Sequence, residues 1–181
     1  SSPYKGIFCY WNGDENRQAV FRMGVQRYKE NNNIKWNSSN DLRGAYSDYS
    51  EDKAEWNIMY PIKDFKYGDE IYYTITLDTT KEFEKDGEKY YKAILYINGE
   101  KLYDGNYNKK QWDNFIQKHL DNLKYFCMGR SSMSDHGQWH YSKLNAYTCR
   151  LYNKALTTEE VKDNYDKSVS YHENAIKSKN K

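Results

Sequence analysis

The sequence predicts a β-rich domain that is closed by a helix near its C-terminal end, and three local patterns support this fold class. Residues 146–152 are rich in β-forming side chains and lead through a short turn into a helix. Thr157 stands three residues before Glu160, which is the spacing of a capping box at a helix N-terminus. Asn98-Gly99, between two β-prone runs, is the strongest two-residue hairpin signal in the chain. We therefore expect a sheet whose last strand leads into a helix packed on its outside.

The composition is that of a folded domain, and it excludes two classes of partner. A chain of 181 residues is long enough for one domain with a substantial core. Its mean hydropathy of -1.16 is low, but 20 Tyr, 6 Phe and 5 Trp supply the apolar surface that a core needs. With 28 basic and 26 acidic residues, the chain lacks the basic character of a nucleic-acid-binding protein. No apolar run approaches the length of a membrane span, so we expect no membrane insertion.

Short β-prone runs separated by polar turns predict the strands. In the first part of the chain, strands are expected over residues 6–11, 19–28, 34–36 and 56–60. Pro61 is expected to end the fourth of them. Residues 37–53 should form a long polar loop, and loops of that length in compact domains are often functional. The later strands are expected over 69–77, 90–97, 125–128 and 141–152, the first two of these joined by a charged tip with a turn at Asp86-Gly87.

Two stretches have a helical pattern instead. Residues 108–123 carry apolar side chains at helical spacing and predict a short inserted helix, for which Asn108 and Gln111 are candidate caps. Its apolar face consists of Trp112, Phe115, Ile116, His119, Leu120 and Leu123. The C-terminal helix is expected over 157–171. Its apolar stripe consists of Val161, Tyr165 and Val169.

Three pieces of the sequence together resemble a known family. The run RLYNKALT at 150–157 is followed by EEV at 159–161 and NY at 164–165. A predicted hairpin over 72–102 contains LYING, and CMGR at 127–130 is a hydrophobic strand followed by Gly-Arg. In this combination the chain is similar to the laminin-G-like, concanavalin A-like domains of bacteria and their phages. The resemblance implies a jelly-roll sandwich of two antiparallel sheets.

Members of that family differ in what they bind, so the resemblance implies a fold more than an activity. Some related folds hydrolyse glycosides with two carboxylates that flank the scissile bond. The nearest approach to such a pair is Glu82, Glu84 and Asp86, which lie in a lysine-dotted hairpin tip and are expected to be solvated and splayed. We therefore expect no enzyme activity. Arg150 and Tyr152 of the motif are expected to be structural and to fasten the closing strand to the terminal helix.

Candidate metal ligands are sparse, and we assign neither a metal ligand nor a cofactor. Asp135, His136 and His140 have a spacing that suits zinc on a helix, but the residues around them favour a loop. His119 lies on the apolar face of the inserted helix and is expected to be half-buried. A structural calcium ion is an open alternative, because related lectin-like folds often carry one. Its ligands would come from Asp48, Glu51 and Asp52, or from Asn12, Asp14 and Asn16.

Aromatic residues in or beside polar loops are the best candidates for a binding site. Sugars stack on Trp or Tyr, while polar side chains hydrogen-bond the hydroxyl groups. The candidate carbohydrate-binding residues are Trp36, Arg43, Tyr46, Tyr49 and Trp139. The leading hypothesis is a non-catalytic, lectin-like carbohydrate-binding module whose partner is a glycan or a host or cell-surface glycoprotein. The alternatives are a structural or adhesive protein–protein module without a sugar ligand, and a glycoside hydrolase of the same fold.

The start of the chain and its cysteines bear on its origin. The chain begins Ser1-Ser2-Pro3 without an initiator Met, so we expect a module excised from a larger secreted, cell-surface or virion protein. One domain is expected over 1–172, with 173–181 as a basic tail or linker. Three cysteines leave one disulfide open as an alternative in an exported protein. They are Cys9, Cys127 and Cys149, of which Cys149 is otherwise expected to be a small buried hydrophobe.

Overall fold

The computed structural model is mainly β, as the sequence predicts. It describes residues 4–11, 20–31, 33–43, 56–66, 68–119, 125–133, 139–141 and 145–179. These residues hold ten strands and two helices. The chain divides into two compact units. Unit 1 comprises Ser1–Gly68 and Asn108–Leu144, and unit 2 comprises Asp69–Tyr107 and Asn145–Lys181.

Unit 1 is built on a five-stranded sheet in which every pairing is antiparallel. The strands lie in the order β4-β3-β2-β1-β8. They are β1 (Tyr4–Trp11), β2 (Val20–Glu30), β3 (Asn33–Arg43), β4 (Trp56–Ile62) and β8 (Tyr125–Met128). Among the side chains that the structure describes on these strands, the buried hydrophobic ones are Cys9, Met23, Val25 and Ile62. Strand β8 pairs with β1 only after the chain has passed through the first segment of unit 2, so this ladder closes the sheet over a long sequence separation.

The third strand is much longer than the sequence indicates. Predicted over 34–36, it runs from Asn33 to Arg43, so the polar loop expected over 37–53 was predicted to start too early. Asn, Ser and Asp are weak strand formers. However, β3 pairs along its whole length with β2, and from Trp36 to Leu42 it also pairs with β4. Ladders on both sides satisfy the backbone and override the local propensity.

Strand β4 continues through Pro61, which was wrongly expected to end it. Pro61 lies opposite Asn37 of β3, and β4 is an edge strand of the described sheet. Proline has no N–H to donate, so it is tolerated in an edge strand, where one side of the backbone needs no ladder partner.

The other described elements of unit 1 are a small sheet and a helix. Strands β9 (Arg130–Met133) and β10 (Trp139–Tyr141) form an antiparallel pair. Helix α1 (Lys109–His119) confirms the inserted helix predicted over 108–123, and its described part ends at His119. The side-chain oxygen of Asn108 accepts a hydrogen bond from the Gln111 backbone N–H at 3.1 Å, which makes Asn108 the N-cap.

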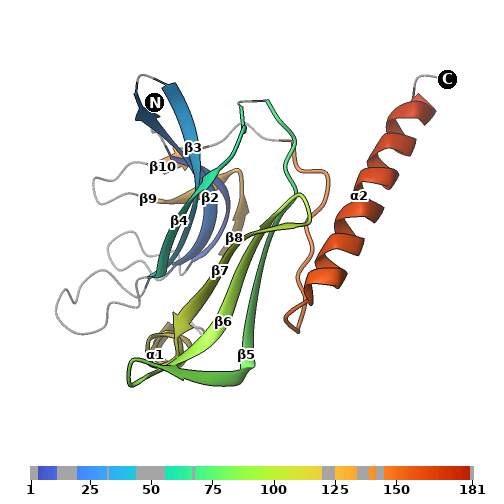
Figure 1. Cartoon of the computed structure of the whole chain (residues 1–181). Helices are drawn as coiled ribbons and strands as arrows, with labels where there is room; N and C mark the ends of the chain where they lie inside the picture. The colour runs from blue at the N-terminus through green and yellow to red at the C-terminus, as the bar shows by residue number, and fades with distance from the viewer. Residues whose placement is uncertain are drawn as a thin grey trace. The chain divides into compact units, whose positions relative to one another are not determined.

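Unit 2 begins with three strands joined by two tight turns. Strands β5 (Tyr73–Lys85), β6 (Glu88–Ile97) and β7 (Glu100–Asn108) lie in that order in one sheet (Figure 1). Both residues of Asp86-Gly87 and both residues of Asn98-Gly99 have positive φ angles, which is the geometry of type I′ hairpin turns. The two turns predicted from the sequence are therefore confirmed.

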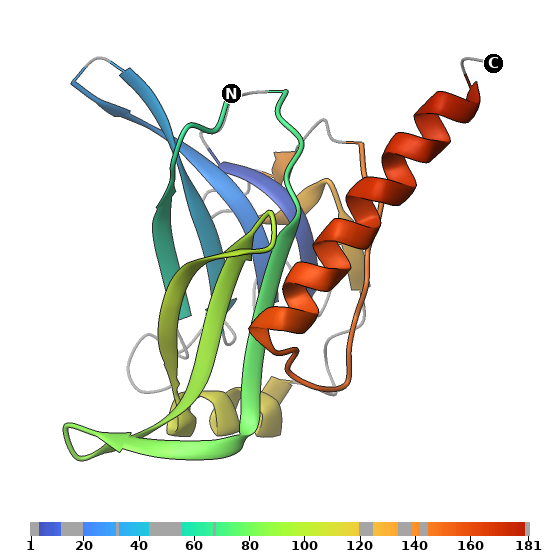
Figure 2. The same cartoon turned by 45° about the vertical axis from the view of Figure 1, so that its right-hand side comes forward.

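The β5–β6 hairpin bends part-way along its length. Asp78 lies opposite Lys92, but the next pair is Glu82 with Tyr91, so β5 carries the extra residues 79–81. Figure 2 shows the outer part of the hairpin turning away from the rest of this sheet. The Asp78 carboxylate accepts hydrogen bonds from the hydroxyl and the backbone N–H of Thr80, at 2.6 and 2.9 Å. These two hydrogen bonds hold the bend and lower the pKa of Asp78.

Helix α2 (Thr158–Lys179) begins at the predicted capping box. The Thr157 backbone N–H donates to Glu160 Oε2 at 2.9 Å, and the Glu160 backbone N–H donates to Thr157 Oγ1 at 3.2 Å. Lys154 also donates to the Glu160 carboxylate. The hydrogen bond from Lys154, followed by that from the Thr157 backbone, lowers the pKa of Glu160.

The first turn of α2 packs on the three-stranded sheet through a small core. Leu156 and Val161 form a buried cluster with Tyr96 of β6. The Tyr96 hydroxyl lies 3.1 Å from Thr158 Oγ1, so the ring is buried while its polar end keeps a hydrogen bond. This cluster fixes the N-terminal end of the helix on the sheet.

The closing strand predicted over 141–152 is not formed at the described residues 145–152. Tyr141 is the last residue of β10, and residues 145–152 belong to no strand and are exposed. Leu151 is 80% exposed. β-Forming composition is not sufficient without a neighbouring strand that takes up the backbone hydrogen bonds. For the same reason Cys149, which was expected to be buried, is exposed.

The C-terminal helix is longer than predicted and is buried over a shorter length. It extends to Lys179, so most of the tail expected over 173–181 is helical, as its Glu, Ala and Lys residues allow. Val161 is fully buried, but Val169 of the predicted stripe is 37% exposed. No helix in the described part of the chain has the length and apolar character needed to cross a membrane.

Candidate functional site

Three of the five predicted carbohydrate-binding residues have a described backbone position, and all three lie in unit 1. Trp36 and Arg43 belong to β3, and Trp139 is the first residue of β10. Tyr46 and Tyr49 lie outside the described residues, as does the polar loop in which they were predicted. The sequence therefore remains the only basis for including those two tyrosines in a site.

Trp36 and Arg43 stand near the two ends of β3 rather than in or beside one loop. Trp36 lies opposite Arg27 of β2, and Arg43 lies opposite Val20. The register is continuous between them, so seven residues at about 3.3 Å each separate their Cα atoms by about 23 Å. The expectation that Arg43 lies in the loop over 37–53 is thus wrong. One sugar ring cannot contact both residues, and positions seven apart on a regular strand belong to opposite faces of the sheet.

Trp139 belongs to a different sheet from these two residues. It lies opposite Met133 in the β9–β10 pair, where the register shifts between Trp139 and His140. A bulge of this kind re-aims the local backbone and is common beside binding sites. The described backbone does not join Trp139 to β3 through any ladder of the five-stranded sheet.

The segment between Trp36 and Arg43 has an unusual composition for its place in the sheet. Residues 37–41 read NSSND, and β3 has a neighbouring strand on each side. A strand inside a sheet normally carries apolar residues on at least one face. Five consecutive polar residues depart from this pattern, and amide, hydroxyl and carboxylate groups are of the kinds that bind polar ligands. The sequence prediction placed this segment in a loop because it ended the strand at Trp36.

The acidic residues considered for glycoside hydrolysis lie at the tip of the β5–β6 hairpin. Glu82, Glu84 and Asp86 are all exposed, as the sequence predicted. The Glu82 carboxylate forms an ion pair with Lys89 across the hairpin. Glycoside hydrolysis needs one of two carboxyl groups to be held protonated by its surroundings. Glu82, Glu84 and Asp86 are not enclosed by other side chains in this way, because all three are exposed.

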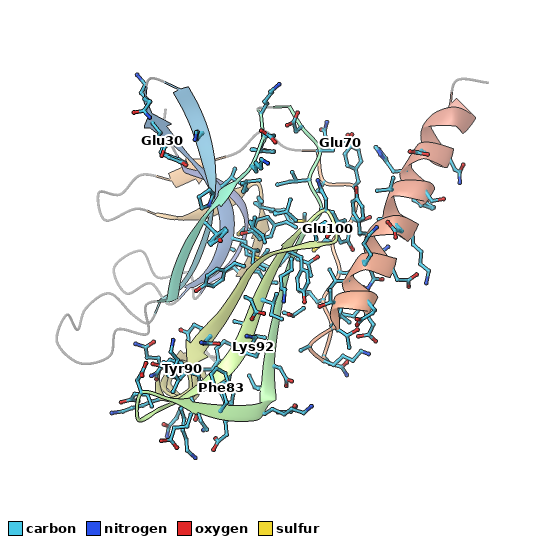
Figure 3. All side chains as sticks on the ribbon, viewed as in Figure 1. Glu30, Glu70, Phe83, Tyr90, Lys92 and Glu100 are labelled. Atoms are coloured by element: carbon cyan, nitrogen blue, oxygen red, sulfur yellow. The ribbon has the colours of Figure 1, made fainter. Side chains whose placement is uncertain are left out.

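An aromatic pair on the same hairpin was not singled out from the sequence. The rings of Phe83 and Tyr90 are stacked, with centroids 6.0 Å apart and an interplanar angle of 27°. Figure 3 shows these two side chains together on the outer part of the hairpin. Phe83 is 37% exposed. Cross-strand aromatic pairs stabilise hairpins, which explains this pair without a ligand.

Arg150 of the family-like motif has a structural role in unit 2. Its guanidinium donates to the Tyr72 hydroxyl at 3.1 Å and to the Asn164 backbone carbonyl of α2 at 3.5 Å. The Tyr72 ring meets the Tyr165 ring edge-on at 5.9 Å. Arg150 thus links its segment to the helix as predicted, although that segment is not a strand. Tyr152 is 46% exposed.

The candidate metal ligands are not brought together by the described residues. His140 lies in β10 and His119 ends α1, whereas Asp135 and His136 lie outside the described residues. Both groups of calcium candidates, in residues 12–16 and 48–52, are outside them as well. Within the described segments, no three His, Cys, Asp or Glu side chains are grouped so that they could hold a metal ion.

Comparison with known proteins gives no family assignment. No protein-family model matches the chain, and neither the curated proteins nor the solved structures gave a match.

Proposed function

We propose that this chain is a non-catalytic, lectin-like carbohydrate-binding module with a concanavalin A-like jelly-roll fold. The observation that carries the proposal is the polar run over 37–41 inside β3, in which positions 38 and 40 belong to the same face of the strand as Trp36. Amide, hydroxyl and carboxylate groups bind sugar hydroxyls, and an indole ring stacks on the apolar face of a sugar. Arg43 belongs to the other face of the strand, so a ligand on the Trp36 face would not contact it.

Burial in the three-stranded sheet supports the sandwich fold. Ala93 and Leu95, on one face of β6, are 0% and 2% exposed, and Tyr96 on the other face is 0% exposed. Leu156 and Val161 cover Tyr96. The face that carries Ala93 and Leu95 must therefore be covered by a second layer, as the inner face of each sheet in a sandwich is.

A module of this kind belongs to a larger secreted, cell-surface or virion protein, where its partner is a glycan or a glycoprotein. The nearly balanced charge of 28 basic and 26 acidic residues supports a neutral polar ligand over nucleic acid. The solvated carboxylates of the β5–β6 hairpin support binding without hydrolysis.

A broad glycan array followed by calorimetric titration of the best oligosaccharide tests the proposal. We expect specific binding with a Kd between micromolar and millimolar. The array should be repeated after chelation with EDTA, because a loss of binding would assign a role to calcium. Blank results in both the array and the titration would refute the carbohydrate-binding proposal.

A second candidate, an adhesive protein–protein module, is favoured by the exposed apolar residues of unit 2. Tyr147, Leu151 and Tyr171 are 57%, 80% and 77% exposed. Exposed apolar side chains are typical of protein interfaces where they gather in one patch. The two candidates separate cleanly, because substitution of Leu151 by Ser would weaken an adhesive contact and would leave glycan binding unchanged.

A further inference from the structure

Two cysteines occupy directly opposite positions on neighbouring strands of unit 1. Cys9 of β1 is the register partner of Cys127 of β8. Directly opposite residues of an antiparallel pair project to the same face of the sheet. Cys9 is fully buried and Cys127 is half-buried, and both are thiols in this structure. The third cysteine, Cys149, is exposed and lies in unit 2.

The ladder indicates how far apart the two backbones are. The Gly129 backbone N–H donates to the Ile7 carbonyl at 2.8 Å, one step beyond the Phe8–Met128 pair. Hydrogen-bonded pairs recur every second position, so Cys9 and Cys127 form a pair of the same kind. Their Cα atoms are then about 5.5 Å apart, inside the range of roughly 4.4–6.8 Å found for disulfides.

We propose that Cys9 and Cys127 form a reducible cross-strand disulfide that links β8 covalently to β1. The Cβ atoms of such a pair are about 5 Å apart, whereas a disulfide needs about 3.8 Å. The two strands must therefore draw together slightly when the bond forms. Bonds that require such adjustment are more readily reduced than unstrained structural disulfides.

The difference in burial assigns an order to the reaction. The half-buried Cys127 thiolate attacks a small disulfide oxidant, such as oxidised glutathione, and releases one molecule of thiol. The buried Cys9 thiolate then attacks the Cys127 sulfur of the mixed disulfide and releases the second molecule of thiol. The protein loses two hydrogen atoms, and the oxidant is reduced to two thiols.

The position of β8 gives the bond a consequence for the fold. Strand β8 is an edge strand of the described sheet and reaches β1 only after the inserted segment of unit 2. A disulfide between residues this far apart in the sequence strongly restricts the unfolded chain. Oxidation should raise Tm by about 10 °C, and reduction should reverse the change.

The test uses the Cys149→Ser variant of the full chain, which lacks the exposed thiol that would cross-link molecules. This protein is incubated with oxidised glutathione under native conditions, alkylated, digested without reduction and mapped by mass spectrometry. We expect a peptide that links Cys9 to Cys127, a loss of two alkylatable thiols and a Tm rise that dithiothreitol reverses.

The control adds Cys127→Ser to the same protein, and its Tm should not rise with oxidant. If that variant does not fold, the peptide map of the Cys149→Ser protein decides alone. Retention of both thiols, a stable glutathione adduct on Cys127, or a linkage that forms only in denaturant would overturn the proposal.

Discussion

Gly99, in the β6–β7 turn, packs directly against Tyr165 of helix α2. A Cβ atom added at Gly99 would come within 3.0 Å of Tyr165 Cδ1 and 2.9 Å of Lys162 Cδ. The same glycine has a φ angle of 77°, so it is required both by its turn and by its neighbour. The β6–β7 turn and helix α2 therefore pack against each other. The Asn98-Gly99 pair, which predicts the hairpin turn, is also the place where the helix contacts the sheet.

Substitution of Gly99 by Ala should destabilise the protein by about 2–4 kcal/mol, since it combines backbone strain with a clash against the helix. Gly87 provides a matched control, because its φ angle is 76° and nothing lies within 4 Å of an added Cβ. Gly87→Ala should cost only the backbone term, about 1 kcal/mol. Urea unfolding followed by circular dichroism measures both, and equal losses would show that α2 does not dock on the turn.

Loss of the capping hydroxyl in Thr157→Ala should cost about 1 kcal/mol of unfolding free energy. The Glu160 backbone N–H would lose its acceptor at the first turn of α2. Thr157→Ser keeps the hydroxyl and should stay close to wild type. Thermal unfolding of the three proteins compares them, and a serine variant as unstable as the alanine variant would contradict the capping role.

The stability of α2 should also fall in acid because of Glu160. Its folded pKa lies below the ordinary value of 4.5, so its contribution is complete above that pH and is lost as the pH falls through the folded pKa. Glu160→Gln should lower stability at neutral pH and flatten the decline between pH 5 and the acid limit. Lys154→Met should reproduce part of this flattening, because the Lys154 hydrogen bond is the largest cause of the shift. An unchanged pH profile in both variants would refute this assignment.

Arg150 and Tyr72 should show a small but measurable coupling. The guanidinium and the hydroxyl are 3.1 Å apart and exposed, so a double-mutant cycle with Arg150→Ala and Tyr72→Phe should give about 0.5 kcal/mol. Tyr72→Phe keeps the ring that meets Tyr165 and removes only the hydroxyl. Strict additivity of the two changes would mean that the hydrogen bond contributes nothing to stability.

The sequence predicts correctly those features of the fold that depend on interactions between residues close together in the chain. The capping box at Thr157, the Asn108 cap and the two type I′ turns depend on residues within four positions of one another, and all are confirmed. The extent of β3 depends instead on β2 and β4, which supply ladders that its polar residues do not announce. The opposite error at 145–152 has the same origin, because strand-forming residues there lack a pairing strand.

The positions of the candidate site residues also depend on strand pairing, which the local sequence does not predict. Residue type identified Trp36 and Arg43, but only the pairing of β3 places them at opposite ends of one strand, about 23 Å apart. Cys9 and Cys127 likewise lie opposite each other only because of the register between β1 and β8. That register cannot be read from the sequence of either strand alone.

The most direct test of the carbohydrate-binding proposal is calorimetric titration of Trp36→Ala and Tyr46→Ala with the oligosaccharide selected by the array. Phe83→Ala serves as the matched control, since it removes an exposed aromatic ring from the hairpin of unit 2. We predict that the first two variants keep the circular dichroism spectrum of the wild type and lose at least tenfold in affinity, while the control binds normally. Wild-type affinity in both folded variants would contradict the account.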